Sequence, residues 1–478
     1  MSESQILKRE FTFGSAFAFA FAFISPIVAL YGIFGLAYST AGPAFWWNFL
    51  IVFGGQILVA MVFAELVSRW PLEGSVYQWT IRLIGKTAGW YAGWFYMWTL
   101  VVAMATVALG AAGFVANSFG LSVSAGQQAI IAIVILALGT FANIRGRGTL
   151  KVLLVGAIIA EIIGSVGLGI WLFFFHQEQP ISSITEGLDS IGGAGFTNSS
   201  FLIAMAFVGW AFVGFESAGA IAEEVKDPQR NLPKAVLFSI TFVAAIVAFS
   251  ALAVILAIPN PEAILSGEEA DPVYATLVYA LGEGAARVVN ILFAIGFLAS
   301  FLALQTSASR VIWAYARDNA LPAKAYLSKI SGAESIPSRA VSVATIVGVI
   351  MIALSQFAPN FFALMVNFTT GGFYISFWFP VLGFAVVYYS GKWVPGPFSF
   401  GKKMSVISGA ALIWVTFQFL NISWPRPVYP DNVWLDWSVA IAMIGLVIVG
   451  ALIYFAKRDK MTIVDADEVN RQSESSGQ

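Results

Sequence analysis

The sequence predicts an all-α polytopic membrane protein with twelve transmembrane helices. Of its 478 residues, 59% are hydrophobic and only 11% are charged, whereas an ordinary soluble domain carries about 25% charged residues. Apolar runs of about 20 residues, long enough to cross a bilayer as a helix, recur along nearly the whole chain. We therefore expect the lipid bilayer to be a partner of this chain and nucleic acid not to be one.

The apolar segments are expected at residues 12–38, 44–69, 87–117, 127–144, 149–175, 200–222, 233–258, 284–316, 337–357, 361–390, 403–421 and 434–456. Positive charge alternates with them. Every one of the 25 Lys and Arg residues except Arg287 and Arg426 falls on the side that holds the N-terminus. Because cytoplasmic loops carry the excess of Lys and Arg, we expect both termini in the cytoplasm. The chain then lies in the plasma membrane, which is the inner membrane if the cell is bacterial.

Several function classes are disfavoured by what the sequence lacks. It has no cysteine, and its single histidine, His176, ends an apolar run, so neither a thiolate metal site nor a histidine cluster is expected. No phosphate-binding P-loop and no nucleophile–base set is visible. We expect no enzyme activity, no cofactor and no ATP drive. The start MSESQILKRE is followed by an apolar run too long for a cleaved signal peptide.

Two apolar segments carry an interruption. The first reads FAFISPIVALYGIFG around Ser25 and Pro26, and a proline inside a helix removes a backbone hydrogen bond. The sixth reads FLIAMAFVGWAFVGFESAGAIAEE, with Gly214 and Glu216 well inside it. A carboxylate at that depth is costly and usually faces a cavity or a partner. The alternative for Pro26 is a simple kink in which Ser25 bonds back to a carbonyl.

The two interruptions occupy corresponding places if spans 1–5 and 6–10 are two halves. Five spans are an odd number, so the second half would insert upside down, as an inverted repeat. The predicted organisation is a cytoplasmic segment 1–11, repeats 12–176 and 200–391, two further helices in 402–457 and a disordered tail 458–478. Interrupted helices in corresponding positions of two repeats indicate a transport site near the middle of the membrane.

Four stretches resemble signatures of the amino acid–polyamine–organocation (APC) superfamily, and most closely its amino acid/choline transporter branch. They are Ala64-Glu65-Leu66 with Pro71, Gly74 and Tyr77; Asn143 with Gly146; GFESAGAIAEEVKDPQRNLPKA from Gly214; and ARDNALP from Ala316. The resemblance implies a LeuT-type fold, which is a 5+5 inverted repeat with two additional helices. It also implies alternating access around helices 1, 3, 6, 8 and 10.

The resemblance also implies which residues bind the substrate. In amino-acid-transporting members the substrate carboxylate meets helix 1 amides, and its amine meets carbonyls of helices 1 and 6. The expected substrate-binding residues are Ile24, Ser25, Pro26, Ile27, Trp210, Val213, Gly214, Phe215 and Glu216. GWAFVGFES is similar to helix 6 of arginine/agmatine antiporters, which places Trp210 at an aromatic gate. The alternatives are a packing role for Trp210 and a structural role for Glu216 in holding the broken helix.

One departure from the family bears on the substrate. Many members have a glycine-rich stretch at the helix 1 break, whereas this chain has Ser25-Pro26-Ile27-Val28. Fewer bare N–H groups can then converge on a carboxylate. A ligand with a distal amine, or an amine without a carboxylate, therefore stays open as the substrate.

Glu161 and Ser300 are the candidates for ion coupling. Glu161 lies in the otherwise apolar AIIAEIIGSVG, at about the spacing where several relatives have a lysine that mimics a sodium ion. A carboxylate there can instead hold a proton, a sodium ion or the substrate amine. The alternative is a neutral acid that bonds to a neighbouring helix. Glu65, Glu223 and Glu224 are expected to form ion pairs with nearby Arg69, Lys226 and Arg230.

These observations predict a secondary active transporter that imports an amino acid or a related small amine, driven by protons or else by sodium. The alternatives within this class are a choline-type organic cation transporter and an amino acid/amine exchanger. A nutrient sensor that does not transport is the alternative from another class. The oligomeric state is not predicted.

Overall fold

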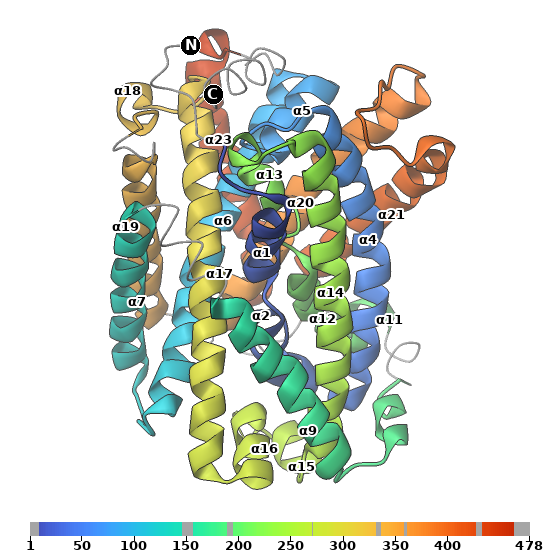
Figure 1. Cartoon of the computed structure of the whole chain (residues 1–478), viewed down its shortest axis with the longest axis vertical. Coiled ribbons are helices and arrows are strands. Elements are labelled where there is room, and N and C mark those ends of the chain that lie inside the picture. The colour runs from blue at the N-terminus through green and yellow to red at the C-terminus, as the bar shows by residue number, and fades with distance from the viewer. Residues whose placement is uncertain are drawn as a thin grey trace.

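The computed structural model describes residues 9–145, 156–188, 195–269, 271–330, 336–357, 361–426 and 433–462. In these ranges the protein is built of helices, without a named β-strand, and twelve of the helical segments are long and apolar enough to cross a membrane (Figure 1). The prediction of an all-α, twelve-span membrane protein is confirmed.

The spans in chain order are α1–α2 (Phe13–Tyr31), the α3–α4 segment (Phe34–Arg69), α6 (Lys86–Ser118), α7 (Ala125–Arg145), the segment Gly156–Phe175 that ends in α9, the α12–α13 segment (Ser200–Ala220), α14 (Pro228–Ala257), α17 (Glu283–Arg317), the α19 segment (Ser338–Phe357), α20 (Phe361–Tyr389), the α21 segment (Gly401–Ser423) and the α23 segment (Ser438–Lys460). Short helices α5 (Val76–Ile84), α15 (Pro261–Leu265) and α16 (Pro272–Leu281) lie between them.

Several boundaries differ from the predicted ones; α14, for example, begins at Pro228 and not at residue 233, and the first two spans differ most clearly. The first span was expected to reach residue 38, but α2 ends at Tyr31 and a separate helix α3 (Phe34–Ala41) follows. The predicted start of the fifth segment at residue 149, and the motif residue Gly146, lie outside the described residues.

Corresponding spans of the two expected halves pack against each other. Extensive packing joins α4 to α14, α6 to α17 and α7 to α19, which are spans 2 and 7, 3 and 8, and 4 and 9. Pairing of this kind is what a two-fold relation between two halves would produce. The division into repeats at residues 12–176 and 200–391 stays a prediction.

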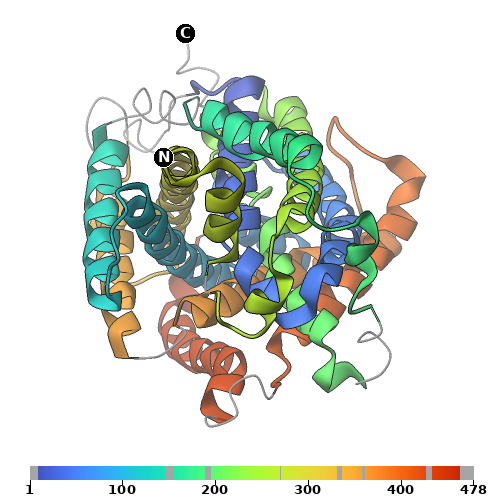
Figure 2. The ribbon, with the colours of Figure 1, turned by 90° about the horizontal axis from the view of Figure 1, so that it is seen from below.

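The first and sixth spans and the long helices α6 and α17 lie in the interior, whereas α7, α19, α21 and α23 lie at the rim. In the view from below, α7 and α19 lie together at one edge, away from α23 (Figure 2). Rim helices expose large apolar side chains, such as Leu138 at 64%, Ile413 at 73% and Leu452 at 71%. An apolar surface of this extent fits lipid, not water. The chain is a multi-pass membrane protein.

The described residues nearest the two chain ends lie on the same face of the bundle, at the top of Figure 1. Phe11 forms a β-bridge with Val225, and the N–H of Thr462 donates to the carbonyl of Asp318 just beyond α17 (3.0 Å). We call this the basic face, and the opposite face, which holds α15 and α16, the acidic face. That the basic face is cytoplasmic stays a prediction.

Candidate functional site

The first span is broken between α1 (Phe13–Ile24) and α2 (Pro26–Tyr31). Ser25 lies at the break with a φ of 50°, in the left-handed region that residues other than glycine seldom adopt. Its N–H closes α1 by donating to the carbonyl of Phe21 (2.8 Å). Pro26 then begins α2 at the position where a missing N–H costs nothing. The proline therefore starts a second helix and does not merely kink one.

Glu161 of the fifth span holds this break. The Ser25 hydroxyl donates to one carboxylate oxygen of Glu161, and the Ile27 N–H donates to the other (2.9 Å). The Val28 N–H donates to the Ser25 hydroxyl oxygen (3.1 Å). The donors in the first turn of α2 are thus satisfied by protein groups. Both oxygens of Glu161 act as acceptors, which suits an ionised carboxylate at a helix N-terminus.

The helix that carries Glu161 is itself irregular. A π-helix, η3 (Ile162–Gly167), follows Glu161 directly, and the Tyr31 hydroxyl donates to the carbonyl of Gly164 within it (3.3 Å). π-helical turns are rare and occur often at functional sites. The sequence carries no signal for this turn, because its residues are as apolar as those of an ordinary membrane helix.

The sixth span is broken between η5 (Gly209–Phe212) and α13 (Ser217–Ala220). Gly214 has a φ of 106°, and its N–H donates to a carboxylate oxygen of Glu216 (2.9 Å). The other oxygen of Glu216 accepts from the Tyr96 hydroxyl of α6 (3.1 Å). Glu216 therefore ties the break to the central helix, as the structural alternative for this residue requires.

The two breaks meet at a small cavity. A Cβ added to Gly214 would lie 2.2 Å from Cδ1 of Phe23, and the Ser300 hydroxyl of α17 donates to the carbonyl of Phe23 (2.8 Å). Between the two breaks is a cavity of about 20 Å³, which is roughly the room that one water molecule needs. Its lining consists of Phe23, Ile24, Val28, Ala29, Ala103, Val107, Trp210, Val213, Ser300, Leu304 and Phe373.

Four of the predicted site residues, Ile24, Trp210, Val213 and Ser300, line this cavity. The others lie at the breaks around it. Ser25 and Ile27 are bonded to Glu161, and the Phe215 ring packs against Phe63 and Phe377. The seven other lining residues were not among the predicted site residues: Phe23, Val28, Ala29, Ala103, Val107, Leu304 and Phe373. The family resemblance indicated helices 3, 8 and 10, but an apolar helix gives no signal for which of its faces is turned inward.

Among the described residues that line the cavity, Ser300 offers the sole hydroxyl, and the rest are apolar apart from the Trp210 indole. The break in helix 1 also leaves backbone carbonyls without their usual helical donors. Pro26 has no N–H to donate to the carbonyl of Ala22, and the Val28 N–H has turned from the carbonyl of Ile24 to Ser25. Carbonyl oxygens without helical donors attract a cation or an N–H donor. A ligand with an ammonium group would suit such carbonyls, but the space of about 20 Å³ must widen before an amino acid or an amine can enter it.

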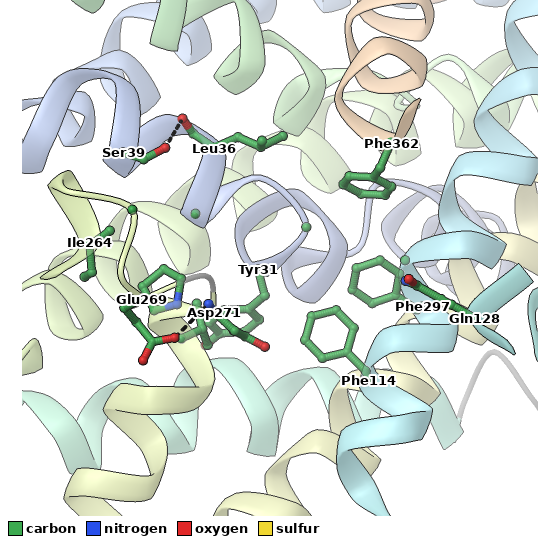
Figure 3. A pocket seen from close by; sticks show the side chains of 16 residues that line it. Tyr31, Leu36, Ser39, Phe114, Gln128, Ile264, Glu269, Asp271, Phe297 and Phe362 are labelled. Carbon is green, nitrogen blue, oxygen red and sulfur yellow. Dashed lines mark hydrogen bonds between the residues drawn. The ribbon is translucent and has the colours of Figure 1, made fainter. Parts of the chain in front are cut away.

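Trp210 separates this cavity from a larger vestibule on the acidic face. A Cβ on Gly32 of the first span would lie 3.1 Å from Cζ3 of Trp210 and 3.3 Å from Cζ of Phe297. Gly32 and Phe297 line the vestibule, a hollow of about 470 Å³ (Figure 3). A thin layer that includes Trp210 and Phe297 thus stands between the two spaces, in the position of a gate.

Acidic groups lie at the mouth of the vestibule. The Asp271 carboxylate accepts from the Tyr274 N–H (3.0 Å) and the Asn117 side chain (3.1 Å), and Glu269 accepts from the Asp271 N–H (2.9 Å; Figure 3). Burial raises the pKa of Asp271, these two hydrogen bonds lower it, and the charge of Glu269 raises it. Negative groups at a cleft mouth concentrate cations there.

Comparison with known proteins shows the family. The family described as amino acid permease matches residues 11–450. The chain belongs to the amino acid permease family. The branched-chain amino acid permease BcaP of Lactococcus lactis is 26% identical over 85% of this chain and 88% of its own. The BAT1 homolog amino-acid permease of rice is 24% identical over 90% and 87%, and BcaP of Bacillus subtilis 24% over 96% and 96%.

Family membership makes this protein an amino acid transporter and a multi-pass plasma membrane protein, not an enzyme. The predicted resemblance to the APC superfamily is confirmed.

The permease is closed on its basic face by ion pairs. Nε of Arg310 lies 3.0 Å from Glu224, and Nη1 of Arg317 lies 3.1 Å from Glu223. These partners differ from the expected ones, because α17 arginines and not the nearby Lys226 and Arg230 hold the two glutamates. Glu65, also expected in an ion pair, accepts from the Ser399 hydroxyl (2.7 Å) and the Phe400 N–H (2.6 Å).

Proposed function

We propose that this permease is a secondary active transporter that imports a small aliphatic amino acid, or a related amine, by alternating access coupled to protons. The observation that carries the proposal is the cavity at the two helix breaks, closed on one side by Trp210 and Phe297 and on the other by ion pairs. A compartment with a closure on each side is what alternating access requires.

The lining supports an aliphatic substrate. Val107, Val213 and Leu304 offer an apolar surface, which favours a hydrocarbon side chain over a charged one. Two of the relatives are named as permeases for branched-chain amino acids. We therefore propose leucine, isoleucine and valine as the first substrates to test.

Glu161 supports proton coupling. Both of its oxygens accept hydrogen bonds from the helix 1 break. A proton on this carboxylate would turn one acceptor into a donor, so the contact with Ser25 or Ile27 would have to change. Proton binding and the geometry of the substrate-binding helix are thereby linked. Sodium is the other candidate ion.

A carboxylate-free amine is the second candidate substrate. The resemblance to the superfamily implies that the donors of the first turn of α2 would meet a substrate carboxylate, but here they are bonded to Glu161 and Ser25. An amine with the same apolar body would need only the carbonyl oxygens.

The test is uptake by purified protein in liposomes under an imposed proton or sodium gradient. Each amino acid is matched with its decarboxylated amine, leucine with isopentylamine and valine with isobutylamine; GABA and choline complete the panel. Leucine uptake that follows the proton gradient supports the proposal. Uptake of the amines alone selects the second candidate, and uptake of neither class contradicts both.

Trp210→Ala tests the gate. Removing the indole opens the layer to the vestibule, so we expect bound substrate to leave faster and Kd to rise about tenfold, or ~1.4 kcal/mol. Binding is measured with radiolabelled substrate in detergent. An unchanged Kd and an unchanged dissociation rate would mean that Trp210 packs against its neighbours and does not act as a gate.

A further inference from the structure

The loop between α4 (Trp46–Arg69) and α5 (Val76–Ile84) fills the closed basic face. A Cβ on Gly74 would lie 3.2 Å from the Cβ of Ala314 in α17, and one on Gly219 of α13 would lie 3.0 Å from the Cβ of Ser75. The loop is therefore wedged between α17 and the broken sixth helix. Gly74 and Ser75 both have positive φ, 93° and 33°, which fixes this tight turn in one shape.

Glu73 of this loop is a buried carboxyl with an exposure of 0%. Among the residues that the structure describes, none donates a hydrogen bond to either of its side-chain oxygens. Its backbone N–H donates to Oε1 of Glu223 (3.1 Å), so a second carboxylate stands close by. An ionised carboxylate in such surroundings is far more costly than a neutral acid.

The neighbouring arginines are engaged elsewhere. Arg310 is paired with Glu224, and Arg317 donates to both oxygens of Glu223 and to Asp318 (3.2 Å). Burial raises the pKa of Glu73 well above its usual range, and the charges of Glu224 and Glu223 raise it further, while Arg310 and Arg317 act in the opposite direction. The closed gate thus favours the protonated form of this side chain.

The ion pairs Arg310–Glu224 and Arg317–Glu223 close the basic face, and we call them the inner gate. We infer that Glu73 is a proton-binding site of this gate. The site is occupied when the gate is closed, and it releases its proton to the solution at the basic face when the gate opens. The proton comes from that solution and returns to it, so it is not the proton that Glu161 would carry across. The inference rests on the proposed alternating access for the function that it gives the gate.

The equilibrium between the closed and the open gate depends on pH, because the two states bind different numbers of protons. The closed gate binds more protons than the open one, in which Glu73 would titrate as an exposed glutamate near pH ~4.3. Low pH at the basic face therefore favours closure, and this preference falls as the pH rises above that value. If the basic face is cytoplasmic, a proton-coupled importer that acidifies the cell would shut its own inner gate.

The test labels the gate directly. The chain has no cysteine, so Ser217→Cys, at a fully buried position of α13, gives one thiol that opening would expose. A membrane-impermeant thiol reagent is added at the basic face at pH 5 to 8. Each rate is divided by that of the unfolded protein at the same pH, which removes the titration of the thiol itself.

We expect the normalised rate to rise with pH, by up to about tenfold per pH unit. Glu73→Gln in the same background, a neutral mimic of the protonated acid, should label slowly at every pH. Asp227→Asn is the matched control, because Asp227 is an exposed acid on the same face; it should keep the pH dependence. No substrate is needed, so failure of the proposed function would not affect the result.

Two outcomes would overturn the inference. One is Glu73→Gln labelling with the pH dependence of the parent, which would mean that Glu73 takes up no proton. The other is faster labelling at all pH values, which would mean that an ionised Glu73 holds the gate through the arginines. If the variant does not fold, the infrared band of a protonated carboxylic acid is measured at pH 6 in a Glu161→Gln, Glu216→Gln background, which removes the other buried carboxyls of the two helix breaks. A band there supports a buried neutral Glu73, and its absence contradicts it.

Discussion

Each of the two helix breaks is held by hydrogen bonds to a carboxylate, but the two carboxylates lie at very different separations along the chain from the break that they hold. Glu216 caps the break of the sixth span from two residues away, whereas Glu161 reaches the first break from 136 residues away, in another helix. One break is a local structure, and the other exists through a tertiary contact. A change in the fifth span should therefore move the first helix, while the sixth helix carries its own support.

The largest effect is expected where the two breaks touch. Gly214→Ala forces a residue with a side chain to a φ of 106° and places its Cβ 2.2 Å from Phe23. Strain of this kind costs about 1–3 kcal/mol, and the overlap with the ring adds to it. We expect the folded protein to be lost or its melting temperature to drop sharply. Gly54→Ala, where nothing lies within 4 Å, is the control and should melt as the parent does.

Glu161→Gln should come second. The amide cannot accept from both Ser25 and Ile27, and a buried donor without an acceptor costs about 1–3 kcal/mol. We expect lower thermal stability and uptake that no longer follows an imposed proton gradient. If proton-driven uptake persisted in full, Glu161 would not be the coupling group.

Glu216→Gln should be milder and should leave coupling intact. Its amide oxygen can still accept from Gly214, and its NH₂ group can donate to the Tyr96 oxygen, so we expect a loss of about 1 kcal/mol. Thermal melts of the two Gln variants measured side by side give the comparison. Loss of proton-driven uptake here, with Glu161→Gln unaffected, would reverse the roles assigned to the two carboxylates.

Ser300→Ala should have the smallest effect. It removes one hydrogen bond, to the carbonyl of Phe23, and leaves an acceptor that the substrate amine can use; the expected loss of stability is about 1 kcal/mol. Substrate affinity, measured by ligand-induced shifts of the melting temperature, should change by less than about tenfold. A complete loss of binding would make Ser300 a direct ligand.

The sequence located both breaks because their signals are local. A proline or a carboxylate inside an apolar run is visible without knowing the fold, and so is the alternation of spans and positive loops. The residues that pair with these carboxylates and with those of the basic face could not be predicted from the sequence. Glu223 and Glu224 were expected to pair with neighbouring basic residues, yet they pair with arginines 94 and 86 residues away. The bond from Glu161 to Ser25 and the inward faces of α6 and α20 likewise depend on helix packing, which apolar sequence does not specify.

The length of α17 bears on where the inner gate works. Its 35 residues extend about 52 Å, well beyond the ~30 Å hydrocarbon core. Arg310 and Arg317 occupy its last turns, so the gate lies near the depth of the lipid headgroups. If the basic face is cytoplasmic, a surface potential of about −30 mV from anionic lipids would concentrate protons there, equivalent to roughly half a pH unit. The composition of the leaflet, and not the bulk solution alone, would then set the acidity that Glu73 experiences.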